Sequence, residues 1–151
     1  MTYETVANGL ETLLEGVSGF AAAQVAQADY AVLNKGVTRA IVILDGGNTE
    51  ERISFGGRFR STYLFDIQLF ARYLNGPADT ENQLRDDREL IADRIRKFPK
   101  LNATAGVLVA NIVGTGPTEM PPDELQASPN AWRMKQIMCE VWEEITVTES
   151  E

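Results

Sequence analysis

The side chains that most often carry catalysis are scarce in this sequence of 151 residues. There is no histidine, which removes the usual general base and the commonest transition-metal ligand. The single cysteine, Cys139, excludes an intrachain disulfide and a CxxC motif. Carboxylates occur as neighbours at Asp86–Asp87 and Glu143–Glu144. Because consecutive residues of a helix or strand do not face each other, we expect solvated surface charge there rather than an acid–base pair.

Two glycine pairs, Gly46–Gly47 and Gly56–Gly57, could suggest a phosphate-binding loop. Neither lies in a GxxxxGK[ST] motif or in a GxGxxG that opens a helix, so we interpret both pairs as hairpin turns. Cys139 lies on an apolar strand pattern, which is typical of a small buried hydrophobic side chain rather than a reactive thiol. The sequence therefore predicts no enzymatic activity, no metal and no cofactor.

Composition limits the possible partners. Fourteen basic and 22 acidic residues give a net charge of −8, which makes the chain a poor general binder of nucleic acid. Apolar residues make up 44% and charged residues 24%, as in ordinary globular proteins, and the length suits one domain over residues 1–151. No apolar run approaches the length of a membrane span, and the N-terminus lacks a signal-peptide pattern. We expect a soluble protein kept in a reducing cytoplasm.

Periodicity places the secondary structure. Apolar residues at helical spacing predict a helix over residues 3–16 and another over 80–98, the second with a Thr80–Gln83 capping box. Alternating or β-branched runs predict strands at 37–44, 52–55, 61–73, 107–113 and 131–147, while residues 18–36 could be extended. This order predicts an α+β fold: a single mixed or antiparallel sheet with two helices on one face, and a long loop between the last two strands.

Two features indicate a protein partner. Four large apolar residues, Trp132, Met134, Met138 and Trp142, share the face of the last strand that the helices do not cover. If exposed, they would form an apolar patch of the kind found at subunit interfaces. The alternative is that residues 18–36 cover this face within the same chain.

The second feature is a proline-rich segment over residues 114–130, which is longer than most connections inside a domain. We predict an arm that contacts a neighbour; a disordered loop is the alternative. Its candidate contact residues are Pro117, Met120, Pro121, Pro122 and Leu125.

Charge is distributed unevenly. Arg52, Arg58 and Arg60 lie close together in a predicted loop, where they could contact an acidic neighbour or passing DNA, or only keep an exposed loop soluble. Residues 1–100 carry 12 basic and 14 acidic groups, net −2, whereas residues 101–151 carry two and eight, net −6. Such a difference between the two parts could favour head-to-tail association of copies.

The order of these elements resembles a known family. The likeness lies in the N-terminal helix ending near Gly16, the VTRAIVILDGG and RSTYLFDIQLFARY strands, the helix NQLRDDRELIADRIRKFPKL, the strand GVLVANIVGTGP and the closing strand WRMKQIMCEVWEEI. These stretches cover most of the chain. The chain resembles the tail terminator, or tail completion, proteins of long-tailed bacteriophages.

This resemblance implies an α+β subunit of the virion neck, assembled in the host cytoplasm. Such proteins form a homo-oligomeric ring, usually of six subunits, on the last ring of the tail tube. The ring stops tube polymerisation and joins the tail to the head, so its partners would be the tail-tube protein below, a head-completion protein above, and DNA passing through the centre. No catalytic residue belongs to this role.

Two alternatives stay open. A head-completion, connector or tail-tube subunit would also form rings, but a tube subunit would form long cylinders. A small α+β ligand-binding module or enzyme would instead be a monomer with a deep pocket, which Asp66, Gln68 and Arg72 could line.

Overall fold

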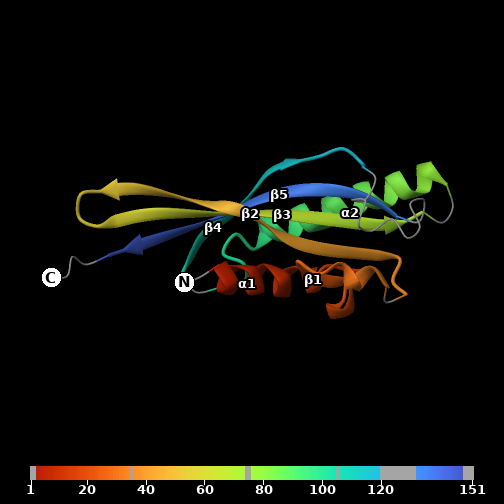
Figure 1. Cartoon of the computed structure of the whole chain (residues 1–151), viewed down its shortest axis with the longest axis horizontal. Coiled ribbons are helices and arrows are strands. Elements are labelled where there is room, and N and C mark those ends of the chain that lie inside the picture. Colours follow the sequence, from red (N-terminus) through yellow and green to blue (C-terminus); the bar gives the residue numbers. More distant parts are fainter. Residues whose placement is uncertain (1–2, 35, 74–75, 105, 120–131, 148–151) are drawn as a thin grey trace.

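The computed structural model of the chain describes residues 3–34, 36–73, 76–104, 106–119 and 132–147. Two helices and five strands form the domain (Figure 1): α1 (Tyr3–Glu15), β1 (Val25–Gln27), β2 (Arg39–Ser54), β3 (Arg58–Arg72), α2 (Pro77–Lys97), β4 (Val107–Thr115) and β5 (Trp132–Thr146). Two short 3-10 helices, η1 (Ala22–Gln24) and η2 (Tyr30–Asn34), flank β1.

The five strands form one sheet in the order β1-β2-β3-β5-β4. β1 pairs with β2 in parallel, and the other pairings are antiparallel, so the sheet is mixed as predicted. β3 is the central strand, and β5 pairs with it from Arg58↔Thr146 to Arg72↔Trp132. This pairing makes the sheet longer than either helix, so the helices cover only part of its length.

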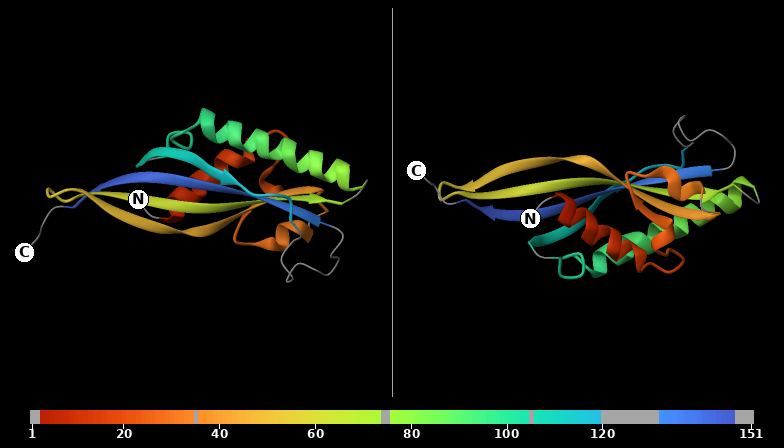
Figure 2. Two further views of the ribbon diagram at one scale, coloured as in Figure 1. Left: turned by 90° about the horizontal axis from the view of Figure 1, so that it is seen from above. Right: turned by 60° about the horizontal axis from the view of Figure 1, so that its bottom comes forward.

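Both helices pack on the same face of the sheet, as the sequence predicts (Figure 2). Each helix buries its apolar stripe because residues three and four apart share one side of a helix. The buried side chains are Val6, Ala7, Leu10, Leu13 and Leu14 of α1 and Leu84, Ile91 and Ile95 of α2. They meet alternate residues of the strands, among them Phe65 of β3, on which Tyr3 stacks at 5.4 Å between ring centroids.

A second, smaller core lies on the opposite face, hereafter the open face. Val32 and Leu33 of η2 pack there against Ala40, Val42, Phe70, Trp132 and Met134 of the sheet. The sequence suggests that residues 18–36 could be extended; among the described residues of this segment, only Val25–Gln27 is a strand. The segment therefore covers one end of the open face and leaves the rest of it uncovered.

The two glycine pairs differ in what they do. The predicted turn at Gly56–Gly57 is confirmed, since it joins β2 to β3 with Gly57 at φ +83°. The predicted turn at Gly46–Gly47 is wrong, because β2 runs through it as one strand. Gly46–Gly47 forms a β-bulge instead: the register with β3 shifts between Asp45 and Gly47, and Gly47 has φ +111°. A bulge with a left-handed glycine bends a strand without ending it.

The predicted capping box at Thr80–Gln83 is also wrong, because α2 begins three residues earlier. Pro77 occupies the first turn, where a missing N–H costs nothing. Thr80 lies inside the helix, and its hydroxyl donates to the Gly76 carbonyl at 3.1 Å.

Candidate interaction surface

The sheet extends well beyond the two helices at one end (Figure 1). We call this projection the blade: residues 48–63 of the β2–β3 hairpin, residues 142–146 of β5, and Val147, which directly follows β5. Gly57 allows β5 to reach the end of the hairpin, since the Val147 N–H donates to the Gly57 carbonyl at 2.8 Å. A Cβ at Gly57 would lie 2.2 Å from the Val147 carbonyl oxygen. The blade is therefore a hydrogen-bonded, three-stranded structure and not an irregular loop.

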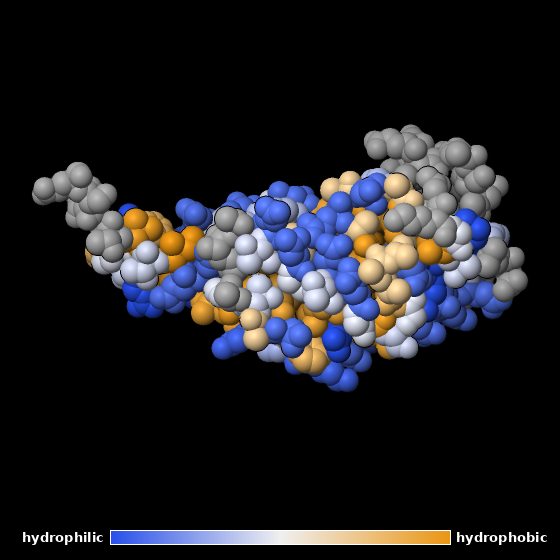
Figure 3. Space-filling model, turned by 90° about the horizontal axis from the view of Figure 1, so that it is seen from below, coloured by the Kyte–Doolittle hydropathy of each residue, from blue (hydrophilic) through white to orange (hydrophobic). Residues whose placement is uncertain are grey.

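The end of the blade carries exposed apolar side chains. Phe55 is 102% exposed, Val147 53% and Ile53 41%, and Phe59 and Ile145 are half-buried beneath them. A hollow of about 450 Å³ lies between Arg52, Phe55, Gly56, Gly57, Phe59 and Val147. Figure 3 shows these hydrophobic atoms gathered at the projecting end, apart from the body. Exposed apolar groups clustered in this way mark an interaction site more often than scattered ones do.

The three predicted arginines lie on the blade, but they do not form a free basic patch. Arg58 donates to Glu144 Oε1 from its Nε at 2.6 Å. The guanidinium of Arg52 lies 4.6 Å from the Phe59 ring centroid, and that of Arg60 lies 4.6 Å from Trp142. Arg60 also lies opposite Glu51 on β2 and Glu144 on β5. Of the three arginines, Arg58 is therefore paired with an acid, whereas Arg52 and Arg60 keep their charge beside aromatic rings.

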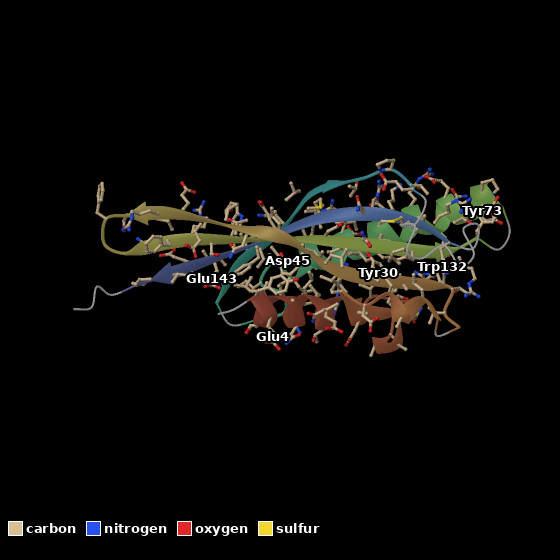
Figure 4. All side chains as sticks on the ribbon, in the orientation of Figure 1. Glu4, Tyr30, Asp45, Tyr73, Trp132 and Glu143 are labelled. Carbon is tan, nitrogen blue, oxygen red and sulfur yellow. The ribbon has the colours of Figure 1, made fainter. Side chains whose placement is uncertain are left out.

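The structure separates the four residues of the predicted apolar patch. The prediction of one exposed patch is wrong for Trp132 and Met134, which are 7% and 2% exposed in the second core. Met138 and Trp142 are half-buried on the uncovered part of the open face. Trp132 lies at the end of the sheet opposite the blade, on the side of Tyr30, whereas Glu143 marks the root of the blade (Figure 4). Trp142 alone of the four belongs to the blade.

The predicted arm begins later than residue 114. β4 runs through Thr115, and the Gly116 N–H donates to the Gln136 carbonyl at 2.9 Å. Glu119 forms an isolated bridge with Met134, so residues 114–119 lie along the edge of β5, with Pro117 exposed between these pairings. Met120, Pro121, Pro122 and Leu125 lie outside the described residues.

The prediction of solvated surface charge is correct for one carboxylate of each neighbouring pair and wrong for the other. Asp86 and Glu144 are exposed, but Asp87 is 0% and Glu143 4% exposed. Asp87 accepts hydrogen bonds from Arg39 Nε at 3.0 Å and Gln83 Nε2 at 2.9 Å, which compensates its burial. Burial raises the pKa of the Glu143 carboxyl, the nearby Glu50 carboxylate raises it further, and a hydrogen bond with Tyr63 lowers it. Asp87 is therefore compensated within the fold, whereas Glu143 is buried with one carboxylate oxygen that has no hydrogen-bond partner among the described residues.

A polar network occupies the middle of the open face. The Tyr30 hydroxyl donates to Gln68 Oε1 at 2.8 Å, and Gln136 Nε2 donates to Asp66 Oδ2 at 3.3 Å. Burial raises the pKa of Asp66, although a hydrogen bond from Gln68 lowers it. Arg72 instead lines a separate hollow with Arg39 and Thr80, so the pocket imagined for Asp66, Gln68 and Arg72 is not formed by these three together.

Across the described part of the chain, no group of three or more Cys, Asp or Glu side chains is placed to hold a metal ion. Cys139 is fully buried, as its strand pattern predicts, and burial raises the pKa of its thiol to about 12. Within the same residues, no helix is long and apolar enough to cross a membrane.

Comparisons with known proteins give no relative. No protein-family model matches the sequence, and a search of curated proteins finds no significant match.

Proposed function

We propose that this chain is a structural protein of a long-tailed bacteriophage that forms a ring at the end of the tail tube. In this role the ring stops tube polymerisation and provides the surface that joins the tail to the head. Its neighbours are the tail-tube protein on one side and a head-completion protein on the other, and the ring is hexameric in the family that the sequence resembles. The protein acts in the virion neck after assembly in the host cytoplasm.

The observation that carries this proposal is the blade. Three strands continue past the helices, and their end exposes Phe55, Ile53 and Val147. A chain that extends so much apolar surface away from its own core gains from covering it with another protein. A ring meets that need, because each subunit of a ring contacts two neighbours through two different patches.

The electrostatics suit a channel through which DNA slides. The net charge is −8, and on the blade Arg58 is paired with Glu144. Few free phosphate contacts would hold the passing DNA, since such contacts are what give non-specific binding its strength. The buried carboxylate Asp87 is paired with Arg39 and Gln83, which favours a structural role for it over acid–base catalysis.

The native mass of the purified protein tests this proposal. We expect concentration-dependent assembly in sedimentation velocity, and closed rings of one layer in negative-stain electron micrographs. Long cylinders would favour the tail-tube alternative. A chain that stays monomeric at several hundred micromolar, alone and with purified tail tubes, would overturn the proposal and favour a ligand-binding module.

A further inference from the structure

A buried carboxylate oxygen without a partner lies at the root of the blade (Figure 4). Glu143 of β5 is 4% exposed, and its Oε2 atom is buried with no hydrogen-bond partner among the described residues. Within the same part of the chain, no Lys or Arg side chain forms an ion pair with Glu143. A buried carboxylate lowers stability unless a positive charge or hydrogen-bond donors compensate it. Glu143 Oε2 is therefore an acceptor that suits a cation.

The strand register brings a second carboxylate towards Glu143. Glu50 of β2 lies opposite Ser61 of β3, and Ser61 lies opposite Glu143 of β5, so the three form one row on the face that carries the helices. Neighbouring strands are about 4.8 Å apart, so the two glutamates are attached roughly 10 Å apart, on either side of a short serine. Ser61 is 1% exposed, and the Glu50 carboxylate raises the pKa of Glu143, as like charges that lie close together do. The two glutamate side chains therefore converge above Ser61.

Neutral oxygen atoms surround the two carboxylates. Asn48 and Tyr63 are cross-strand partners in the adjacent row of the same face. The Ser61 hydroxyl donates to Asn48 Oδ1 at 3.0 Å, and the Tyr63 hydroxyl forms a hydrogen bond with the Glu143 carboxylate. We call this group the root cluster; it offers two carboxylates, two hydroxyls and one amide oxygen, from Glu50, Glu143, Ser61, Tyr63 and Asn48.

The donor atoms of the root cluster select the kind of cation. They are all oxygens, which suit hard ions such as Ca²⁺ and Mg²⁺ rather than ions that prefer imidazole or thiolate ligands. Ca²⁺ accepts about six to eight oxygen ligands in a flexible geometry, whereas Mg²⁺ demands a near-ideal octahedron. Side chains from three different strands fit the flexible requirement better. Because only two of the ligands are charged, we expect weak binding, with a Kd on the order of 10⁻⁴–10⁻³ M and water completing the shell.

We propose that the root cluster binds one Ca²⁺ ion, with the carboxylates of Glu143 and Glu50 as its charged ligands and Ser61 between them. The ion compensates the buried charge of Glu143. It also links β2 to β5 across β3 at the point where the blade leaves the body, so it stabilises the three strands of the blade relative to one another. The site belongs to a single chain and does not depend on the proposed ring.

The test uses variants of the full chain that remove one charge and keep the side-chain size. Glu143→Gln and Glu50→Gln each remove a charged ligand. The matched controls are Glu140→Gln on β5 and Glu51→Gln on β2, both on the opposite face of the sheet. Isothermal titration calorimetry with CaCl₂, and with MgCl₂ for comparison, measures binding. Thermal unfolding followed by circular dichroism, in EDTA and in saturating CaCl₂, measures the effect of the ion on stability.

We expect the wild type and both controls to bind one Ca²⁺ per chain, and to bind Mg²⁺ more weakly. Glu143→Gln and Glu50→Gln should each weaken Ca²⁺ binding about tenfold or more. In EDTA, Glu143→Gln should unfold at the same temperature as the wild type or a higher one, because the unpaired charge is gone. In CaCl₂ the order should reverse, since only the wild type gains the energy of the bound ion. A purely structural role of Glu143 would not produce this reversal.

Two outcomes would overturn the site. In one, the folded wild type binds no Ca²⁺ at millimolar concentrations; the amino group of the chain, whose charge lowers the pKa of Glu143, would then be its counter-ion. In the other, Glu143→Gln binds Ca²⁺ as well as the wild type does, or the controls lose as much affinity as it does, which would mean general attraction of cations to an acidic chain. Neither outcome affects the proposed ring, which the native mass tests separately.

Discussion

Two regions of one sheet, the body and the blade, share the same three strands and differ in what covers them. In the body, the helices bury one face of β3, and η2 covers the end of the other face around Phe70. In the blade, Tyr63 and Ser61 at the root of the same strand are still buried, whereas Arg58, Phe59 and Arg60 toward its end are exposed or half-buried. The strand pattern alone does not distinguish the regions, because β-branched and aromatic residues occur in both. The length of the helices distinguishes the two regions, because the sheet is longer than the helices can cover.

The comparison is sharpest between two phenylalanines. Phe65 is 0% exposed beneath Tyr3, whereas Phe55 is fully exposed at the end of the blade. We expect Phe65→Ala to lower the free energy of unfolding by about 3–5 kcal/mol, because it leaves a cavity in the core. Phe55→Ala should change it by less than ~0.5 kcal/mol, as a surface substitution does. Urea unfolding of the monomer measures both, and similar losses would mean that the blade is part of the core.

The two tryptophans give a smaller contrast. Trp132 is 7% exposed in the second core and Trp142 is half-buried on the blade. We expect Trp132→Ser to cost about 3 kcal/mol, near the lower end for a buried tryptophan, since its cluster is small. Trp142→Ser should cost about 1 kcal/mol. Thermal unfolding followed by circular dichroism compares them, and a larger loss for Trp142 would contradict the assignment of Trp132 alone to the monomer core.

The smallest effect concerns pH at the root of the blade. Burial raises the pKa of Glu143 in the folded chain, so the folded state binds more protons than the unfolded state between the two pKa values. Stability therefore falls as pH rises through that interval, and the loss is complete above the folded pKa. Glu143→Gln should remove this loss and stabilise the chain at pH 7 by up to about 1 kcal/mol.

Urea unfolding of the wild type and of Glu143→Gln at pH 4 and pH 7 measures this difference. We expect the variant to gain more, relative to the wild type, at pH 7 than at pH 4. Asp66→Asn, at a half-buried carboxyl whose pKa burial also raises, is the comparison and should change in the same direction. An equal gain at both pH values would mean that Glu143 is not desolvated in solution.

The sequence predicts the layers of this fold well and its local details less well. The helical stripe around Leu10 and the alternation around Phe65 follow directly from periodicity, so the sheet and both helices could be predicted from the sequence. The turn at Gly56–Gly57 and the bulge at Gly46–Gly47 have the same residue types. Only the pairing of the strand beyond the bulge distinguishes them, and pairing is a tertiary property.

The surface is harder to predict, because exposure depends on segments distant in sequence. Trp132 is buried since η2, a hundred residues earlier in the chain, covers it, and no local pattern near Trp132 reveals that. One signal was available: Phe55 directly precedes a glycine-pair turn, and an aromatic residue at a hairpin end has no core to enter. The left-handed backbone at Leu101–Ala103 is harder to predict, because Asn102 favours that conformation but leucine and alanine do not.

The burial of Cys139 has a practical use. Its thiolate forms only at very high pH while the chain is folded, and thiol reagents react with the thiolate. The single native thiol is thus unreactive at neutral pH while the chain is folded. A cysteine introduced at any exposed position can carry a fluorophore or spin label at neutral pH without removal of the native one, so labelling can test the proposed assembly on an otherwise unaltered chain.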